Sequence, residues 1–461
     1  MTSVTSKKIP YISAIQFKES FYEPSPEVGY VFIGNHTPYA NESSPNSVVD
    51  SVSDEKLAWE QMIAAKKITG NDVELVIPKI SWTANTKYKQ YDDLIELEDL
   101  LTGNNSLNVK PMYVYTSQRN VYKCLSNNYS SNSTVEPTGD YTFSNGNIAT
   151  SDGYIWKYMY TVTAAEATAF MTNLYMPVKT AVIPVGGVIG DLSPEDQTRY
   201  NYQTNSAADV GKIYRIQVTA GGTGYATPPT VVINGNGSGA TATAVVSGGV
   251  VTRIDVDTNG ANYSVVSISF TGGGGSGAAA RAILSPKGGH GTDPVSELGG
   301  FYIGMRVVLN GPEGSGDFIV NGATFRQIGV IKNPYNHGTT TIATGTTLSA
   351  LKSLTLAGGS AGGFQVGDYI TDSGGSGARA YVDAFDSTTG VLKYHQNDKT
   401  GYVAFTVGMT ITGATAGSGS IGSLGNPEAD RFSGDVMFVE NRAAIIRSAS
   451  QLEDIKMILE F

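Results

Sequence analysis

The chain of 461 residues contains 40% hydrophobic and 10% aromatic residues, enough to build cores for about two to four domains. Its formal net charge of −10 and its lack of a basic cluster exclude nucleic acid as a partner. No apolar run approaches the roughly 18 residues of a membrane-spanning helix, and the N-terminal residues lack the apolar core of a secretory signal, so we expect no membrane span and a chain made for the cytoplasm.

The first clear elements are a strand and a helix. Residues 30–34 (YVFIG) alternate β-branched and aromatic residues and end in a turn. Residues 54–68 (DEKLAWEQMIAAKKI) predict a helix, because acidic residues come early, lysines come late and Gly70 follows. Asp54 or Ser53 is the expected N-cap.

Short strands and a second helix follow. Thr163 and Glu166 fit a capping box, which predicts a helix that runs to about Leu174. The strands are expected at residues 74–78, 112–115, 121–125 and 154–160.

Glycine divides the chain into three parts. Residues 1–215 contain 11 glycines, residues 216–425 contain 43, and residues 426–461 contain one. The middle therefore differs in composition from both ends, which indicates a body interrupted by inserted modules.

The first glycine-rich region is a tandem repeat with a period of about 38 residues. Ile216-x-Val218 recurs as Ile254-x-Val256, Tyr225 recurs as Tyr263, and the Gly-Ser-Gly-Ala of residues 237–240 recurs at 275–278. Residues 214–285 hold both copies. Alternating Val, Ile and Thr between glycines predicts paired strands joined by glycine turns.

The glycine-rich stretches of this repeat do not match a phosphate-binding loop or a linker. A P-loop needs Gly-Lys-Ser/Thr, whereas Gly239 and Gly277 lead into alanines. A dinucleotide-binding loop opens a helix, which these stretches do not. A flexible linker has no reason to repeat Ile-x-Val and Tyr at a fixed distance.

A second pair of related segments follows at a spacing of 41 residues. Residues 364–371 (FQVGDYIT) resemble residues 405–412 (FTVGMTIT), and each is followed by a Gly/Ser/Ala stretch. Residues 345–425 therefore predict a second small β module, without helix in either module.

The predicted fold class is mainly β with a few helices (α+β), with a β-sandwich-like body interrupted by two small all-β modules. The expected division is a body in residues 1–213, a repeat in 214–285, a second body part in 286–340, a second module in 341–425 and a final body segment in 426–461.

The sequence offers no candidate metal or nucleophilic site. Cys124 is the only cysteine, which excludes an internal disulfide, and its strand-like surroundings favour a buried structural thiol. No G-x-S-x-G motif or His/Cys cluster occurs. The four histidines, His36, His290, His337 and His395, lie far apart in sequence. For His290 we expect a turn-stabilising hydrogen bond to Asp293 or to the backbone.

Acidic and aromatic clusters are better explained by structure than by chemistry. An acidic chain always supplies carboxylate pairs, so Asp92, Asp93, Glu96, Glu98 and Asp99 are expected on a solvated face. The aromatic run 154–160 could stack on sugars or bases, but a half-buried sheet accounts for it better. We therefore assign no catalytic, cofactor-binding or metal-binding residue.

Several body segments together resemble the baseplate wedge subunit family of contractile-tailed bacteriophages, often labelled gene product eight. Similarity covers roughly 10–200, 300–335 and 430–461. The segments are, in order, Val31–Gly34 with Pro38-Tyr39, Leu75–Pro78 with Trp82, Val121–Leu125 with Glu136-Pro137, Asp152–Tyr158, Phe325–Pro334, Ser433–Arg442 and Ile455–Phe461.

This resemblance implies a non-enzymatic structural protein of the virion. Subunits of that family form homodimers and bind neighbouring wedge proteins in the tail baseplate, which is assembled in the host cytoplasm. The family supplies no catalytic residue to carry over. Shorter members connect the body segments more directly, so the two glycine-rich modules are expected to be insertions.

Two alternatives to a structural subunit stay open at this point. A receptor- or glycan-binding tail protein would display the inserted modules, with exposed tyrosines that stack on sugars. A polysaccharide-degrading enzyme would need two carboxylates at a defined separation on a β scaffold.

Overall fold

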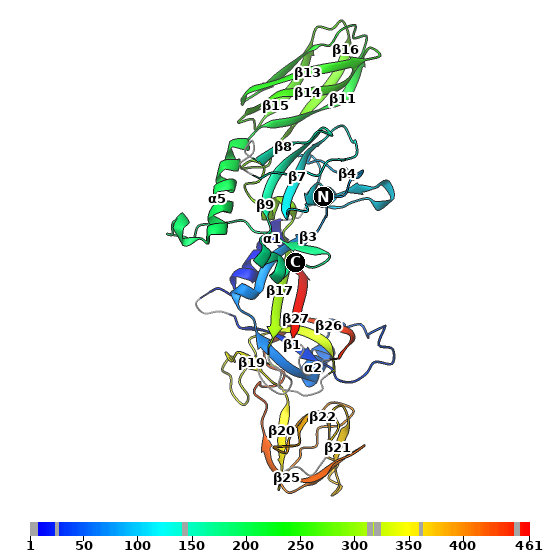
Figure 1. The fold of residues 1–461 in the computed structure, drawn as a ribbon, viewed down its shortest axis with the longest axis vertical. Helices are drawn as coiled ribbons and strands as arrows, with labels where there is room; N and C mark the ends of the chain where they lie inside the picture. The colour runs from blue at the N-terminus through cyan, green and yellow to red at the C-terminus, as the bar shows by residue number, and fades with distance from the viewer. Residues whose placement is uncertain are drawn as a thin grey trace, which may run out of the picture. The chain divides into compact units, whose positions relative to one another are not determined.

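The computed structural model of the protein describes residues 8–23, 27–140, 146–310, 317, 324–358, 363–446 and 452–461. The chain divides into two compact units. Unit 1 comprises the residues up to Gln16, Glu74–Gly304 and Ile458–Phe461, and unit 2 comprises Phe17–Val73 and Met305–Met457. The chain is mainly β with a few helices, as the sequence predicts (Figure 1).

Helices are short and few in the described ranges. The α-helices are α1 (Lys8–Glu19), α2 (Val52–Gln61), α3 (Leu97–Leu101), α4 (Ala164–Phe170), α5 (Pro194–Ser206) and α6 (Pro294–Leu298), and 3₁₀ turns occupy Gly70–Asp72, Asn105–Leu107, Ile189–Asp191 and Ala207–Asp209.

Unit 1 contains a four-stranded sheet of order β6-β7-β9-β8 and a parallel pair, β4 and β5. Its core gathers aromatic side chains, including Tyr122, Tyr154 and Trp156, around Cys124. The strands of the unit outside the repeat are β3 (Val73–Pro78), β4 (Lys87–Tyr88), β5 (Val109–Lys110), β6 (Tyr113–Tyr115), β7 (Asn120–Asn127), β8 (Asn147–Ala149), β9 (Tyr154–Thr161) and β10 (Tyr175–Pro177). The predicted aromatic strand 154–160 is therefore confirmed, and most of its side chains are buried.

Unit 2 contains a five-stranded antiparallel sheet of order β19-β2-β1-β18-β26. Tyr30, Phe32 and Trp59 form the centre of its core. The strands of this sheet are β1 (Gly29–Gly34), β2 (Met62–Lys67), β18 (Thr324–Lys332), β19 (Thr347–Leu348) and β26 (Asp435–Ile446). Two further strands, β17 (Tyr302–Leu309) and β27 (Glu453–Glu460), are neighbours in another sheet, and each has residues in both units.

The predicted helix 54–68 is wrong in its second half. Helix α2 starts earlier, with Ser51 as N-cap, and ends at Gln61, after which residues 62–67 form strand β2. The apolar run from Met62 to Ala65 suits a buried strand as well as a helix. The segment forms a strand rather than a helix because it pairs with β1 on one side and with β19 on the other. The late lysines therefore lie in a strand, where Lys66 pairs with Asp317, and do not complement a helix dipole.

The second predicted helix starts where the capping box places it. In α4 the Thr163 hydroxyl accepts a hydrogen bond from the Glu166 backbone N–H, and the Glu166 carboxylate accepts one from the Thr163 N–H. The helix ends at Phe170, earlier than the predicted Leu174, because β10 begins at Tyr175.

The tandem repeat folds into one six-stranded sheet of order β15-β12-β13-β14-β11-β16 (Figure 1). The first copy supplies β11 (Ile213–Thr223), β12 (Thr230–Gly235) and β13 (Ser238–Ser247), and the second supplies β14 (Val250–Ala261), β15 (Val266–Thr271) and β16 (Ser276–Leu284). The first strand of each copy pairs with the third strand of the other, and the two middle strands pair with each other. Within the first copy, β12 and β13 pair only at Thr230 and Thr243. The predicted β repeat is present, but its main pairing is between copies.

The repeated tyrosines explain why the repeat needs its glycines. Tyr225 and Tyr263 are 5% and 6% exposed. A Cβ atom on Gly275 would lie 2.5 Å from Cγ of Tyr225, and one on Gly237 would lie 2.5 Å from Cγ of Tyr263. Each tyrosine ring therefore occupies space that a glycine of the other copy leaves open.

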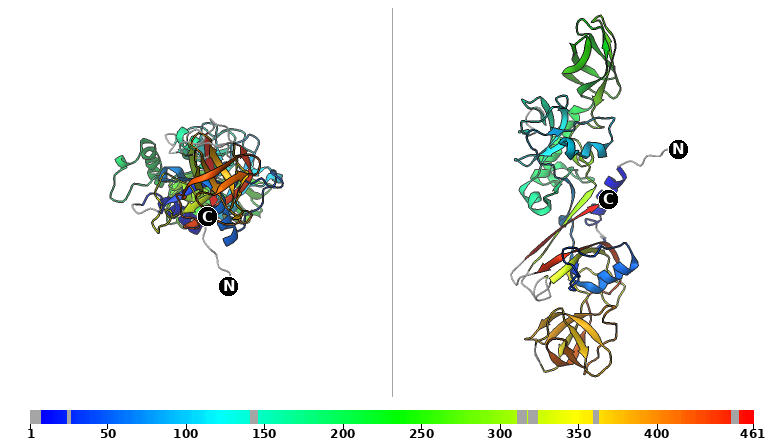
Figure 2. Two further views of the ribbon diagram at one scale, coloured as in Figure 1. Left: turned by 90° about the horizontal axis from the view of Figure 1, so that it is seen from below. Right: turned by 90° about the vertical axis from the view of Figure 1, so that its right-hand side faces the viewer.

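The second glycine-rich region contains a closed barrel of order β20-β23-β22-β21-β24-β25, and the right-hand view of Figure 2 shows its crossing strands in orange. The related segments place Phe364 and Phe405 in its core and pair β21 with β24. The strands are β20 (Lys352–Leu356), β21 (Tyr369–Asp372), β22 (Arg379–Asp386), β23 (Val391–His395), β24 (Thr410–Gly413) and β25 (Ser418–Gly425). The described residues of both modules contain no helix, as predicted.

Candidate functional site

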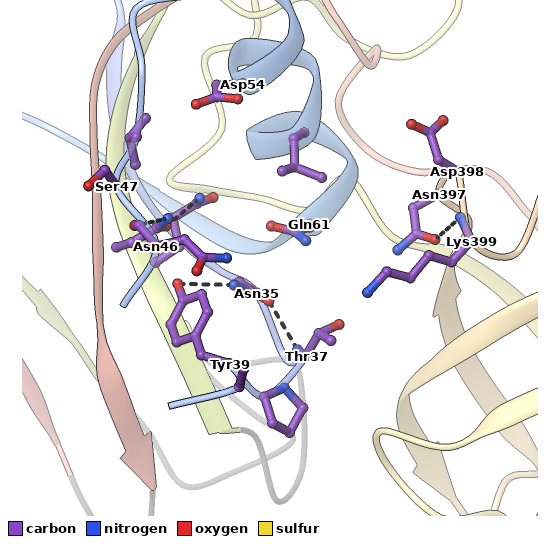
Figure 3. Close-up of a pocket in the computed structure, with 16 residues that line it drawn as sticks. Asn35, Thr37, Tyr39, Asn46, Ser47, Asp54, Gln61, Asn397, Asp398 and Lys399 are labelled. Atoms are coloured by element: carbon purple, nitrogen blue, oxygen red, sulfur yellow. Dashed lines mark hydrogen bonds between the residues drawn. The ribbon is translucent and has the colours of Figure 1, made fainter. Parts of the chain in front are cut away.

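A polar cleft of about 520 Å³ opens in unit 2 (Figure 3). Most of its lining side chains carry an amide, a hydroxyl or a charge. They come from the turn after β1, the loop before α2, α2 itself, strands β18 and β26, and the barrel loop after β23: Asn35, Thr37, Pro38, Tyr39, Ala40, Asn46, Ser47, Val48, Asp54, Leu57, Gln61, Gln327, Asn397, Asp398, Lys399 and Asn441.

The turn after β1 forms one wall of this cleft. Asn35 has φ 62°, a left-handed conformation that asparagine adopts more readily than most residues. Its Oδ1 accepts a hydrogen bond from the Thr37 backbone N–H at 3.0 Å, and its Nδ2 donates to the Tyr39 hydroxyl at 3.2 Å. These bonds, drawn in Figure 3, fix the turn, in which Asn35 is only 6% exposed.

Gln327, one of the residues that line the cleft, carries an unpaired acceptor. Gln327 on β18 is 4% exposed, and its Nε2 donates to Asn441 Oδ1 at 2.9 Å. Asn441 Nδ2 in turn donates to the Asn46 carbonyl at 3.0 Å. Gln327 Oε1 is buried and has no hydrogen-bond partner among the described residues. Buried polar atoms are rarely left unpaired, so this oxygen calls for an explanation.

The opposite wall is the barrel loop that follows β23. Asn397 is 5% exposed, and its Oδ1 accepts hydrogen bonds from the backbone N–H groups of Lys399 and Thr400. Asp398 turns away from the cleft and accepts a hydrogen bond from the Tyr402 hydroxyl, whereas the Lys399 side chain extends toward the Asn35–Thr37 turn (Figure 3).

Residues next to both walls form a buried cluster of two histidines and one carboxylate. Asp383 is fully buried, His395 Nδ1 lies 2.9 Å from both of its oxygens, and His36 Nε2 lies 3.0 Å from one. Burial opposes ionisation of Asp383, but the charge of His395, the contact with His36 and the hydrogen bond from His395 outweigh it and hold its pKa at about 2. This cluster was not predicted from the sequence, because its members lie far apart along the chain.

The histidine cluster is not a catalytic triad in the part of the chain that the structure describes. His395 Nε2, which would face a nucleophile in a triad, has no hydrogen-bond partner there. The His395 ring stacks on Tyr381 at 5.2 Å. Residues 8–461, apart from the gaps given above, contain no group of three or more His, Cys, Asp or Glu side chains that could hold a metal ion.

A second buried ionic cluster lies in unit 1. Lys157 pairs with Asp209 and Lys123 pairs with Glu297, each at 2.7 Å and each almost without solvent exposure. His290 lies between them, and burial together with the charges of both lysines lowers its pKa well below the usual value. Asp209 precedes the repeat and Glu297 follows it, so the two ion pairs hold the segments on either side of the repeat to strands β9 and β7.

The expected role of His290 is wrong. Its ring packs edge-on against Tyr91 and Tyr214, and its nearest carboxylate is that of Glu297 at 4.0 Å. Asp293 instead accepts a hydrogen bond from the Ser296 backbone N–H as the N-cap of α6, and another from the Thr180 hydroxyl.

The expectation of a solvated acidic face is also corrected in part. Asp92 and Asp93 both pair with Arg281 on β16, so they hold the repeat sheet to the rest of unit 1. Glu98 and Asp99 lie in the first turn of α3, where negative charge is favourable.

The repeat does not present tyrosines for stacking on sugars. Tyr225 and Tyr263, the only tyrosines of the repeated motif, are buried against glycines, so the expected display of exposed rings is wrong for them. Cys124 is buried and free, as predicted, and burial raises its pKa well above the usual value.

The edge strand β26 offers an exposed apolar surface in unit 2. It is the last strand of the five-stranded sheet, and none of its residues is fully buried. A groove of about 500 Å³ runs between its residues 436–439 and the segment 48–55. Val49, Val52 and Met437, which line this groove, are 62%, 67% and 47% exposed.

Comparison with known proteins adds no relative. No protein-family model matches the chain, and no curated protein sequence matches it.

A search of the described helices for a membrane span found none that is long and apolar enough to cross a bilayer.

Proposed function

We propose that the protein is a structural subunit of the baseplate wedge of a contractile-tailed bacteriophage. It acts through protein–protein interfaces, as a homodimer and in contact with neighbouring wedge proteins. It resides in the virion tail after assembly in the host cytoplasm, and it has no catalytic activity.

The resemblance segments support this proposal by their placement. Val31–Gly34 lies in β1, Phe325–Pro334 spans β18, and Ser433–Arg442 covers most of β26. These three strands are neighbours in one sheet although they come from distant parts of the chain. Three of the seven segments therefore share one sheet of unit 2, outside the barrel, whereas the segments at 75–78, 121–125 and 152–158 lie in unit 1.

The observation that carries the proposal is the exposed edge of β26. A 12-residue edge strand presents backbone N–H and C=O groups that can pair with another chain. Soluble proteins usually protect such edges, whereas this one is bordered by exposed valines and by Met437. An apolar edge of this kind suits a stable subunit contact.

Sedimentation of the full chain tests the proposal. We expect a dimer, and co-expression with neighbouring tail proteins should yield a complex that co-purifies. Met437→Lys places a charge beside the edge and should weaken one of these associations at least tenfold. Val265→Lys is the matched control, because Val265 is 69% exposed and lies just before β15 in unit 1, whereas β26 belongs to unit 2.

Two results would overturn the proposal. One is a full-length chain that stays monomeric and binds no tail protein. The other is an association that Met437→Lys and Val265→Lys weaken equally, because the exposed edge would then have no special role.

A further inference from the structure

The buried pair of Lys123 and Glu297 in unit 1 is arranged as two reactants would be. Lys123 lies on β7 and Glu297 lies on α6, and their side chains are 1% and 6% exposed. The Lys123 ammonium nitrogen lies 2.7 Å from Glu297 Oε2. Two groups that are held this close in a fixed geometry react as if they were at very high concentration. Their burial also favours a condensation, because water is the product and a dry site does not return it.

The other carboxyl oxygen of Glu297 accepts hydrogen bonds from two backbone donors. Oε1 accepts one from the Gly291 N–H at 2.7 Å and one from the Asp293 N–H at 3.3 Å. Two backbone N–H groups on one carboxyl oxygen form the arrangement that stabilises the negative charge of a tetrahedral intermediate. The Glu297 carboxyl carbon is therefore prepared for attack by a nitrogen nucleophile.

His290 supplies a path for a proton. Its Nδ1 is buried, has no hydrogen-bond partner among the described residues and lies 4.0 Å from Glu297 Oε2. Burial and the charges of Lys123 and Lys157 lower the pKa of His290 well below its usual value, so its ring is neutral at pH 7 and can take up a proton and return it. Burial also lowers the pKa of Lys123, although Glu297 opposes this shift, and a lysine with a lowered pKa is a better nucleophile.

The neighbouring pair of Lys157 and Asp209 is equally buried but lacks these features. Asp209 accepts hydrogen bonds from two ammonium groups, those of Lys157 and Lys212, each at 2.7 Å, and from Asn147 Nδ2. The two lysines and their hydrogen bonds lower the pKa of Asp209 against the effect of its burial. A carboxylate that is held as an anion in this way is a poor target for attack, so we expect this pair to stay an ion pair.

We propose that Lys123 and Glu297 condense into an intramolecular isopeptide bond. The Lys123 ammonium gives one proton to Glu297 Oε2, and its nitrogen then attacks Cδ. His290 carries a second proton from that nitrogen to Oε2, the Cδ–Oε2 bond breaks and one water molecule leaves, so that an Nζ–Cδ amide remains. The reaction occurs once in each chain and links two residues that are 174 positions apart, on either side of the repeat. The inference does not depend on the proposed role in a baseplate, and either can fail while the other stands.

The intact mass of the denatured full-length protein is the first test. We expect the chain to be lighter than its sequence requires by one water molecule. A tryptic digest should contain one branched peptide in which Lys123 is joined to Glu297, and fragmentation of this peptide locates the bond. A chain with the full mass of its sequence overturns the proposal, and so does a missing water that maps to other residues.

Three variants test the assigned roles. Lys123→Arg should have its full mass, because a guanidinium keeps the charge but is always protonated and does not attack. Lys179→Arg is the matched control and should lose water as the wild type does, since Lys179 is 32% exposed in its pair with Asp196. His290→Phe should form the bond about a hundredfold more slowly, as expected for loss of a proton-transfer group, when the mass is followed during cell-free synthesis.

The outcomes of the variants are decisive in both directions. Loss of water from Lys123→Arg overturns the proposal, and bond formation in His290→Phe at the wild-type rate overturns the proton path through His290. If Lys123→Arg does not fold, the intact mass and the branched peptide of the wild type decide the question without it.

Discussion

Replacing Gly275 by alanine tests the idea that the two repeat copies complete each other. Its added Cβ atom would lie 2.5 Å from Cγ of Tyr225, 2.5 Å from the Thr223 carbonyl oxygen and 2.6 Å from the Tyr225 backbone nitrogen. Non-bonded carbon atoms prefer about 3.5–4.0 Å, so the methyl group overlaps the ring by about 1 Å. Gly275 does not have a positive φ, so the substitution acts through space alone.

The expected cost is about 3 kcal/mol. Overpacking a core costs about 1–3 kcal/mol, and the upper value applies because two of the three crowded atoms are backbone atoms, one at the end of the paired strand β11 and one just beyond it. Each 1.4 kcal/mol is a factor of ten, so amide exchange through opening of the repeat sheet should accelerate about a hundredfold. Hydrogen exchange followed by mass spectrometry resolves this for peptides from residues 230–284.

Two further variants make the result interpretable. Gly237→Ala should have the same effect, because its Cβ atom would meet Tyr263 in the equivalent way. Gly190→Ala is the control, since a Cβ atom there has no neighbour within 4 Å. Exchange within threefold of wild type in both repeat variants would refute the mutual packing of tyrosine and glycine.

Two other expectations concern buried ionisable groups. Because Asp383 has a folded pKa of about 2, below the unfolded value, it should contribute about 2 kcal/mol of stability above pH 4 that is lost as the pH falls toward 2. Urea unfolding of wild type and Asp383→Asn between pH 7 and 2 checks this, and equal pH dependence of the two would contradict it. Cys124 should not react with iodoacetamide at pH 8 unless the protein is unfolded, because burial raises its pKa; mass spectrometry of the intact protein measures this, and rapid labelling of the folded chain would contradict it.

The sequence predicted the elements that depend on local or periodic patterns. The capping box of Thr163 and Glu166 placed the start of a helix, and the 38-residue period placed a β module. The apolar run Met62–Ala65 was wrongly assigned to a helix, because a short apolar run fits the periodicity of a buried helix and of a buried strand equally well. Its pairing with β1 makes it a strand.

Contacts between residues that lie far apart in the chain could not be predicted from the sequence. A repeat shows that two copies are alike, but it does not say that Tyr225 packs on a glycine of the other copy. His36, Asp383 and Gln327 meet their partners only after β1, β18 and the barrel have folded together. The composition of the chain does not reveal the polar cleft, because asparagine and glutamine are just as common in ordinary surface loops as in the lining of a cleft.

The exchange of strands between β11–β13 and β14–β16 also limits how the repeat can change. Neither copy has a complete set of partners, since each first strand pairs with the third strand of the other copy. Loss of one copy by recombination would therefore leave a half-sheet, not a smaller module. In a chain with a single copy, the missing half would have to come from a second chain, and the same pairing would then become a dimer contact.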